Sequence, residues 1–173
     1  MKTVYILRHA KSDRDNATLK DHDRPLSARG RDAAPKMAAY IKSQGYEPEA
    51  VLSSTSRRTV ETYDLVKEAL GKAKVNFEES LYLAEKRQLM DRLRWLDDGL
   101  GSVMLIGHNP GLEELANALA ASPKNEKQER VHRRMREKFS TAALAVIQLP
   151  ATAWRDVKAG TGKLVDFMRP KDL

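Results

Sequence analysis

The sequence predicts an α/β sandwich of three layers, in which helices flank a central sheet that is mostly parallel but mixed. Short β-branched and apolar runs alternate along the chain with segments whose apolar residues recur at helical spacing. The last two strand-like runs follow one another with no helical pattern between them, which makes the sheet mixed. At 173 residues, with 41% hydrophobic and 32% charged residues, the chain fits one domain over residues 1–173.

The expected elements follow in a regular order. Strands are expected over six segments, 3–7, 50–53, 75–77, 103–106, 142–149 and 163–168, of which 75–77 is a minor one. Helical faces are expected within four segments, 33–41, 60–70, 89–96 and 112–119. Because Pro35 removes a backbone hydrogen bond, we expect a kink there or a helix that starts later than Ser27.

Several classes of protein do not fit this composition. The longest apolar runs, 103–106 and 142–147, are too short to cross a bilayer, so no membrane association is expected. The apolar run at the N-terminus is too short for a signal peptide and has no cleavage site after it. The absence of cysteine excludes disulfides and thiolate chemistry. These features together predict a cytoplasmic protein.

The formal net charge is +7, and much of it lies between Lys124 and Lys138, where the local net charge is +4. A basic helix or loop without interleaved aromatic residues is typical of a solvated face. Net charge is the only feature that suggests nucleic acid, so no nucleic-acid partner is expected. An alternative role for this stretch is to steer an acidic protein partner toward the site described next.

Polar residues gather where three of the predicted strands end. Segment 8–12, Arg-His-Ala-Lys-Ser, follows the strand at 3–7, segment 53–58 follows the strand at 50–53, and segment 107–111, Gly-His-Asn-Pro-Gly, follows the strand at 103–106. The carboxyl ends of parallel strands share one edge of an open sheet, and ligands bind there. Asn109 and Pro110 suit the start of a helix whose free N–H groups face the same place. Two histidines and two or three arginines therefore converge.

Such a set of residues suits phosphoryl chemistry. A phosphoryl group carries about two negative charges, and arginines bind it with planar hydrogen bonds. A neutral imidazole, held through its other nitrogen, is a competent nucleophile, and a protonated second imidazole can stabilise the transition state. Because arginine and imidazolium supply positive charge, and no carboxylate cluster of the magnesium-binding kind lies at these junctions, no metal and no cofactor are expected.

The motifs at these junctions resemble those of the histidine phosphatase superfamily, which has the phosphoglycerate mutase-like fold. The similarity is strongest to the small SixA-type phosphohistidine phosphatases and extends over nearly the whole chain. It is carried by segments 7–12, 23–30, 54–62, 105–111, 138–149 and 169–173.

The resemblance implies a role for each matching residue. His9 is the nucleophile that becomes phosphohistidine, Arg8 and Arg58 bind the phosphoryl oxygens, and His108 completes the catalytic pocket. Ser12 adds a hydroxyl group to the phosphate site.

The choice of Arg58 rests on register, because the family places its arginine four residues before a threonine, here Thr62. Arg57 is then a neighbouring surface or rim charge. The chain departs from the family pattern at Ala10, where glycine is most common, and at Ser54-Thr55, where Ser-Pro is common.

The proton donor has the weakest support in the sequence. Glu85 lies in the region where larger members carry an acid, and the alternative is an exposed residue that opens the next helix. The polar cluster Asp21–Asp23 is expected on a solvated loop rather than at the rim of the pocket.

The chain has no room for a large cap domain, so an open site is expected, which suits a phosphorylated side chain on another protein. Transfer from a phosphohistidine exchanges one P–N bond for a similar one and needs less help from an acid. The expected partner is therefore a phosphohistidine protein, with a small phosphomonoester as the alternative. A non-catalytic phosphate-binding module is a further alternative, against which the presence of His9 argues.

Overall fold

The computed structural model describes residues 1–173, and its centre is one six-stranded sheet with the strand order β3-β2-β4-β1-β5-β6. The strands are β1 (Lys2–Arg8), β2 (Ala50–Ser54), β3 (Lys74–Glu78), β4 (Ser102–Gly107), β5 (Leu144–Leu149) and β6 (Lys163–Met168). Strands β3, β2, β4 and β1 pair in parallel, whereas β5 is antiparallel to both β1 and β6. The predicted mixed, mostly parallel sheet is confirmed.

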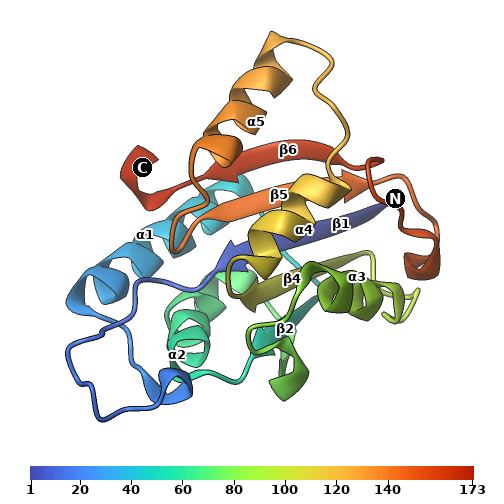
Figure 1. Cartoon of the computed structure of the whole chain (residues 1–173). Helices are drawn as coiled ribbons and strands as arrows, with labels where there is room; N and C mark the ends of the chain where they lie inside the picture. Colours follow the sequence, from blue (N-terminus) through green and yellow to red (C-terminus); the bar gives the residue numbers. More distant parts are fainter.

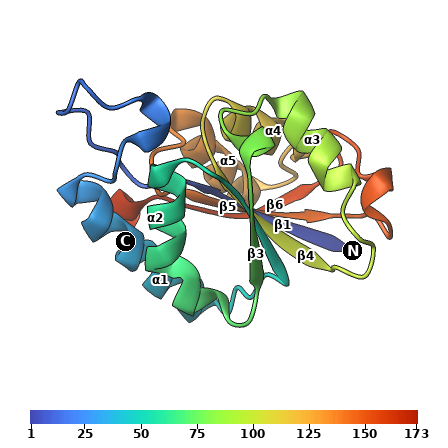
Figure 2. The ribbon, with the colours of Figure 1, turned by 90° about the horizontal axis from the view of Figure 1, so that it is seen from below.

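Five helices cover the two faces of this sheet. They are α1 (Ala28–Gln44), α2 (Arg57–Val66), α3 (Lys86–Arg94), α4 (Gly111–Leu119) and α5 (Glu126–Glu137). Helices α1 and α2 lie against one face, and α3, α4 and α5 lie against the other (Figures 1 and 2). The chain therefore has the three-layer α/β architecture that the alternating sequence pattern predicts.

The sheet is buried on both faces, which fixes the positions of its central strands. Val4 and Ile6 of β1 pack into a cluster of 26 buried residues under α3, α4 and α5. Tyr5 and Leu7, which point to the opposite face, pack into a cluster of 15 under α1 and α2. Because strand side chains alternate between faces, such doubly buried strands appear as continuous apolar runs in the sequence.

The bounds of several elements differ from the prediction, as for β5, which begins at Leu144 and not at 142. Strand β3 extends over Lys74–Glu78 and not only over 75–77. The basic stretch forms helix α5, which buries His132 and Met135. Helix α1 begins directly after Ser27, whose side chain accepts a hydrogen bond from the Gly30 N–H at 3.1 Å, and it continues through Pro35.

No helix in the structure combines the length and apolar character needed to span a bilayer. The cytoplasmic location stays a prediction.

Candidate active site

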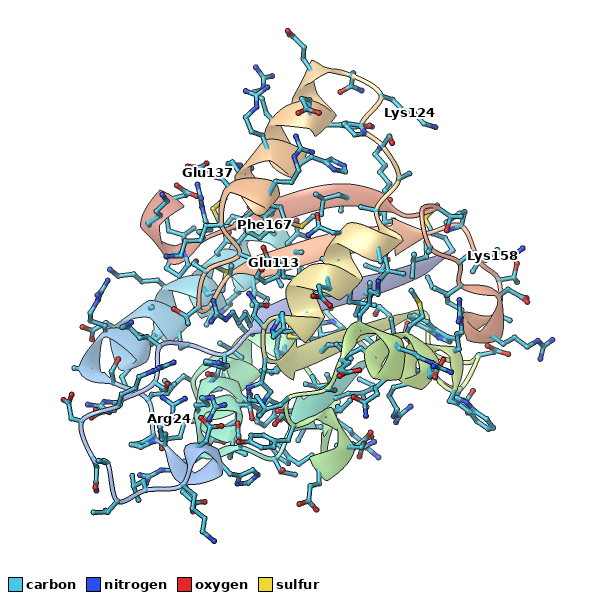
Figure 3. The ribbon with its side chains drawn as sticks, in the orientation of Figure 1. Arg24, Glu113, Lys124, Glu137, Lys158 and Phe167 are labelled. Carbon is cyan, nitrogen blue, oxygen red and sulfur yellow. The ribbon has the colours of Figure 1, made fainter.

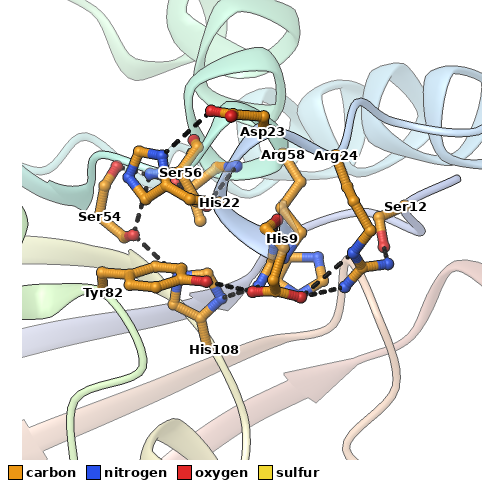
Figure 4. A network of polar contacts seen from close by, with 12 residues as sticks. His9, Ser12, His22, Asp23, Arg24, Ser54, Ser56, Arg58, Tyr82 and His108 are labelled. Atoms are coloured by element: carbon orange, nitrogen blue, oxygen red, sulfur yellow. Dashed lines mark hydrogen bonds and ion pairs between the residues drawn. The ribbon is translucent and has the colours of Figure 1, made fainter. Parts of the chain in front are cut away.

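The three polar junctions lie side by side, because β4 pairs with β1 on one side and with β2 on the other. The carboxyl ends of these three strands border a cavity of about 300 Å³. Figure 4 shows the rings of His9 and His108 together, with Ser12 and Arg24 on one side and Tyr82 and Ser54 on the other. The residues that line the cavity are Arg8, His9, Lys11, Ser12, Arg14, Asp21, Arg24, Arg58, Leu83, His108, Asn109 and Thr141.

His9 is buried and is held in one tautomer. Its Nδ1 lies 2.7 Å from the carbonyl oxygen of Ala10, and because a carbonyl only accepts, Nδ1 carries the hydrogen. Nε2 therefore has a free lone pair. Burial lowers the pKa of His9 to about 3, against the effect of the Ala10 hydrogen bond and with help from the charges of Arg58 and Arg8. The ring is therefore neutral at physiological pH, and the lone pair of Nε2 is available for nucleophilic attack.

The backbone around His9 is held by the neighbouring strand β4 and by helix α2. The N–H of His9 donates to the carbonyl of Gly107 at 3.0 Å, and the N–H of Ala10 donates to Oγ1 of Thr62 at 2.9 Å. Ala10 is fully buried in the core beside α1 and α2, so its methyl group is accommodated where the family most often has glycine. A Cβ on Gly30 would lie 2.1 Å from the carbonyl oxygen of Lys11, so only glycine lets α1 approach this loop.

His108 stands beside the nucleophile, with 5.3 Å between the two ring centroids. Nη2 of Arg58 lies 3.3 Å from Nδ1 of His108, and since a guanidinium only donates, Nδ1 accepts and Nε2–H donates to Ser54 Oγ at 2.8 Å. Burial, followed by the neighbouring His9 and Arg58, lowers the pKa of His108 to about 3. His108 is thus neutral in the anion-free site, and a bound phosphoryl group would raise its pKa toward the protonated form.

Two consecutive arginines in the first turn of α2 have different environments. Arg58 is buried at the cavity and donates to Asp21, through Nη1 to the carbonyl oxygen at 2.7 Å and through Nη2 to Oδ2 at 3.0 Å. Arg57 is exposed and forms an ion pair with Glu61 on its own helix at 3.0 Å. The structure brings Arg58 to the histidines and leaves Arg57 on the surface.

Arg8 and Ser12 also line the cavity, as the sequence predicts. Arg8 donates through Nη1 to the Phe139 carbonyl at 3.0 Å, and burial, opposed by Glu113 and reinforced by Arg14, lowers its pKa. Ser12 accepts a hydrogen bond from Nη1 of Arg24 at 2.7 Å.

Arg24 is a site residue that the sequence analysis missed. It lies within segment 23–30, which was assigned only to the start of the first helix. Arg24 belongs to an irregular loop, so no strand or helix pattern in the sequence predicts that it reaches the cavity. Its place within a motif of the family was the only signal for this role in the sequence.

The prediction that the Asp21–Asp23 cluster lies away from the rim of the pocket is wrong for Asp21, which is exposed but lines the cavity, whereas Asp23 is exposed outside the cavity as expected. Asp21 lines the cavity and accepts hydrogen bonds from Arg58, Arg24 and the hydroxyl of Tyr82. Desolvation raises the pKa of Asp21, but the hydrogen bonds from Tyr82, Arg24 and Arg58 outweigh it and hold the pKa well below its ordinary value. The carboxyl group is therefore ionised and has no proton to give.

Glu85 lies outside the cavity. It is exposed at the N-cap of α3, where its backbone N–H donates to Oε1 of Gln88 at 2.8 Å. The residue from this segment that reaches the cavity is Leu83, whose φ of 52° is in the left-handed region. The structure thus brings together His9, His108, Arg8, Arg58 and Ser12, and does not bring Glu85 to them.

The cavity combines two neutral imidazoles, five cationic side chains and a single ionised carboxylate. This balance suits an enzyme that transfers a phosphoryl group to nitrogen. No group of three or more His, Asp or Glu side chains is placed to hold a metal ion.

Comparison with known proteins identifies the enzyme class. The sequence profile of the histidine phosphatase superfamily (branch 1) matches residues 4–85. An uncharacterized protein of Mycobacterium tuberculosis is 32% identical over 165 residues, which cover 95% of this chain and 100% of that protein. The chain belongs to the histidine phosphatase superfamily.

Two solved structures place the chain in a branch of this superfamily. A candidate phosphohistidine phosphatase SixA from Agrobacterium tumefaciens has 27% identity and a TM-score of 0.80, with 98% of each chain covered. The protein histidine phosphatase SixA in complex with tungstate has 26% identity and a TM-score of 0.76, with 98% of this chain and 97% of that chain covered. The protein is a phosphatase of the SixA-type branch.

Proposed function

We propose that the protein removes the phosphoryl group from phosphohistidine on a partner protein, through a phosphohistidine intermediate on His9 and without a metal ion. One observation supports this substrate most strongly. The cavity holds no carboxyl group that can donate a proton near neutral pH, because Asp21 is ionised and Glu85 lies outside. A leaving group that brings its own proton fits such a site.

In the first step, Nε2 of His9 forms a bond to phosphorus while the P–N bond of the substrate breaks. The electron pair of that bond stays on the substrate imidazole. This ring leaves as neutral imidazole when its other nitrogen is protonated, which is accessible near the ordinary imidazole pKa of about 6.5. The alkoxide leaving group of a phosphomonoester has no such nitrogen that can be protonated in advance, so its departure would need an acid from the protein.

In the second step, water attacks phosphorus and the P–Nε2 bond of His9 breaks. The hydrogen bond from Nδ1–H of His9 to the Ala10 carbonyl keeps a proton on the ring throughout. His9 therefore also leaves as neutral imidazole, and the proton released by water passes to solvent or to the phosphate. The products are inorganic phosphate and the original nucleophile.

The cationic side chains support both steps. Arg8, Arg24 and Arg58 present guanidinium groups around the nucleophile, where they match the phosphoryl oxygens. With this charge in place, the reaction needs no metal for electrostatic stabilisation. Lys11 and Arg14 are exposed at the rim, which leaves the site open to a side chain of another protein.

A single-turnover trap tests the proposal. The protein is mixed with a phosphohistidine peptide labelled in the phosphoryl group, quenched in alkali at short times and mapped for label on His9. We expect label on His9 that decays to inorganic phosphate, unchanged when a chelator is present. The His9→Asn variant, treated in the same way, is the control and should carry no label.

The other outcomes identify the alternatives. Label from a sugar phosphate but none from the phosphohistidine peptide would assign the site to small phosphomonoesters. No label from either donor, together with tight phosphate binding, would make the protein a non-catalytic binding module.

A further inference from the structure

A second cavity adjoins the catalytic one and is larger, with a volume of about 540 Å³. The two cavities share Arg8, Lys11 and Thr141, so they adjoin one another on the surface that follows β1. The proposed reaction makes no use of the rest of the second cavity.

The charged side chains of this second cavity are all cationic. They come from four separate parts of the chain, namely the end of β1, the first turn of α1, the end of α5 and the segment after β6. No acidic side chain lines it. The six cationic residues are Arg8, Lys11, Arg29, Lys138, Arg169 and Lys171.

Most of these charges have no partner. Arg169 is buried and forms ion pairs with Asp172 at 2.7 Å and with Glu137 at 3.7 Å. The pair with Asp172 lies within the short turn that carries Lys171. The side chains of Lys11, Arg29, Lys138 and Lys171 are exposed and form no ion pair or hydrogen bond. Like charges gathered in this way repel one another, and a bound anion would relieve that repulsion.

Helix α1 adds to the positive potential of this surface. Its first turn contains no acidic residue and carries Arg29 instead. Because the N-terminal end of a helix is the positive end of its dipole, a cation there is unfavourable for the helix itself. The arrangement becomes favourable when an anion is bound next to it.

We propose that this second cavity binds acidic side chains that flank the phosphorylated residue of the partner protein. The inference rests on the proposed function and specifies its substrate as a phosphoprotein with carboxylates near the phosphohistidine. The cavity has no aromatic residue on which a nucleic-acid base could stack. Its volume and its position next to the catalytic cavity fit several residues of an extended acidic segment.

The test uses phosphohistidine peptides that differ only in their flanking residues, which are aspartate, alanine or lysine, and phosphoramidate as a P–N substrate without flanks. The variant is Arg29→Glu/Lys138→Glu, which reverses two charges outside the catalytic cavity. We expect kcat/KM for the aspartate-flanked peptide to fall roughly tenfold, mainly through KM, with phosphoramidate unchanged. The lysine-flanked peptide should become a better substrate of the variant than of the wild type.

The matched control is Lys72→Glu/Lys158→Glu, which makes the same change in net charge at exposed positions outside both cavities. Lys158 lies on the other side of the molecule from Glu137, the residue that precedes Lys138 (Figure 3). This control should turn over all substrates as the wild type does. The effect of the cavity variant should fade at high salt, since the screening length is ~3 Å at 1 M.

Several results would overturn the inference. Equal turnover of aspartate-flanked and alanine-flanked peptides by the wild type would remove it while leaving the proposed function intact. If the wild type preferred a sugar bisphosphate over the acidic peptide, and the same variant lost this activity, the second cavity would be a binding site for a small metabolite instead. Failure of the wild type on every P–N substrate would instead reject the proposed function.

Discussion

The catalytic cavity has two walls that differ in how the fold holds them. The strand-end wall consists of Arg8, His9, Arg58 and His108, whereas the loop wall consists of Asp21, Arg24 and Leu83. His9, His108 and Arg58 are 6%, 4% and 3% exposed, but the side chain of Asp21 is 47% exposed and Leu83 is 52% exposed. The core of the protein therefore fixes both histidines and Arg58, while Asp21 and Leu83 lie on more exposed segments of the chain.

The largest expected effect is at the nucleophile of the strand-end wall. The change His9→Asn should lower kcat for phosphoramidate by about 10⁴-fold or more, because no other side chain can accept the phosphoryl group. Binding of inorganic phosphate should survive, since the arginines remain. Steady-state kinetics and phosphate titration measure the two quantities. His132→Asn, at a buried histidine of α5, is the control and should retain activity.

The next largest effect is a loss of activity that is expected at Arg58 but not at Arg57, its neighbour in α2. Arg58→Ala should lower kcat/KM by roughly 10²–10³-fold and weaken phosphate binding, because a buried guanidinium at the phosphoryl site is lost. Arg57→Ala removes only an exposed pair with Glu61, worth about 0.5 kcal/mol to stability and nothing to catalysis. Equal losses at both positions would show that the wrong arginine has been assigned to the site.

The strand-end wall was predictable because apolar patterning locates strand ends. The run Val4–Leu7 ends at Arg8, and the run Val103–Ile106 ends at Gly107-His108. Once these strands are neighbours in a parallel sheet, their polar junctions meet at one edge. Patterning alone therefore leads to both histidines and Arg8, and the family resemblance adds the choice of Arg58.

The loop wall was not predictable in this way. Segment 13–27 has no periodicity, and whether Asp21 reaches the cavity depends on hydrogen bonds to Arg58 and Tyr82 from other elements. The positive φ of Leu83 leaves no mark in the sequence, since leucine has no preference for that conformation. Helix α5 was left open because its two buried residues, His132 and Met135, are surrounded by charged ones.

A third prediction concerns the buried histidines of the strand-end wall. The pKa of His108 is about 3 in the folded protein and about 6.5 when unfolded, so between these values the unfolded state binds more protons. Stability is full above pH 6.5 and is lost as pH falls toward 3, by at most about 1.4 kcal/mol per pH unit for each such histidine. Urea unfolding of wild type and His108→Asn between pH 7 and 4 measures the slope.

The variant should show a shallower slope than the wild type, whatever its absolute stability. Added phosphate should also reduce the slope of the wild type, because a bound anion raises the pKa of His108. Identical slopes for the two proteins would mean that folding does not lower the pKa of His108, and the contrast between the buried wall and the exposed one would then fail.

A smaller effect is expected on the loop wall at Asp21. Its carboxylate competes with a bound anion for Arg58 and Arg24. Asp21→Asn should therefore tighten the binding of inorganic phosphate by roughly fivefold, the equivalent of ~1 kcal/mol for a charge interaction near the surface. Isothermal titration measures it. Weaker binding would show instead that Asp21 orients Arg58 and belongs functionally to the strand-end wall.

The smallest effect is expected at Glu85, beside the loop wall but outside the cavity. Glu85→Gln keeps the size of the exposed side chain at the N-cap of α3, and the backbone N–H of residue 85 can still donate to Gln88. The free energy of unfolding should therefore change by less than about 0.5 kcal/mol. The pH profile of kcat/KM for phosphoramidate should be unchanged, because the leaving group needs no proton from the protein. The same variant should be assayed with a sugar phosphate, whose alkoxide leaving group does need one. Loss of the basic limb of that profile would show that Glu85 moves into the cavity when substrate binds, and that the loop wall supplies chemistry as well as recognition.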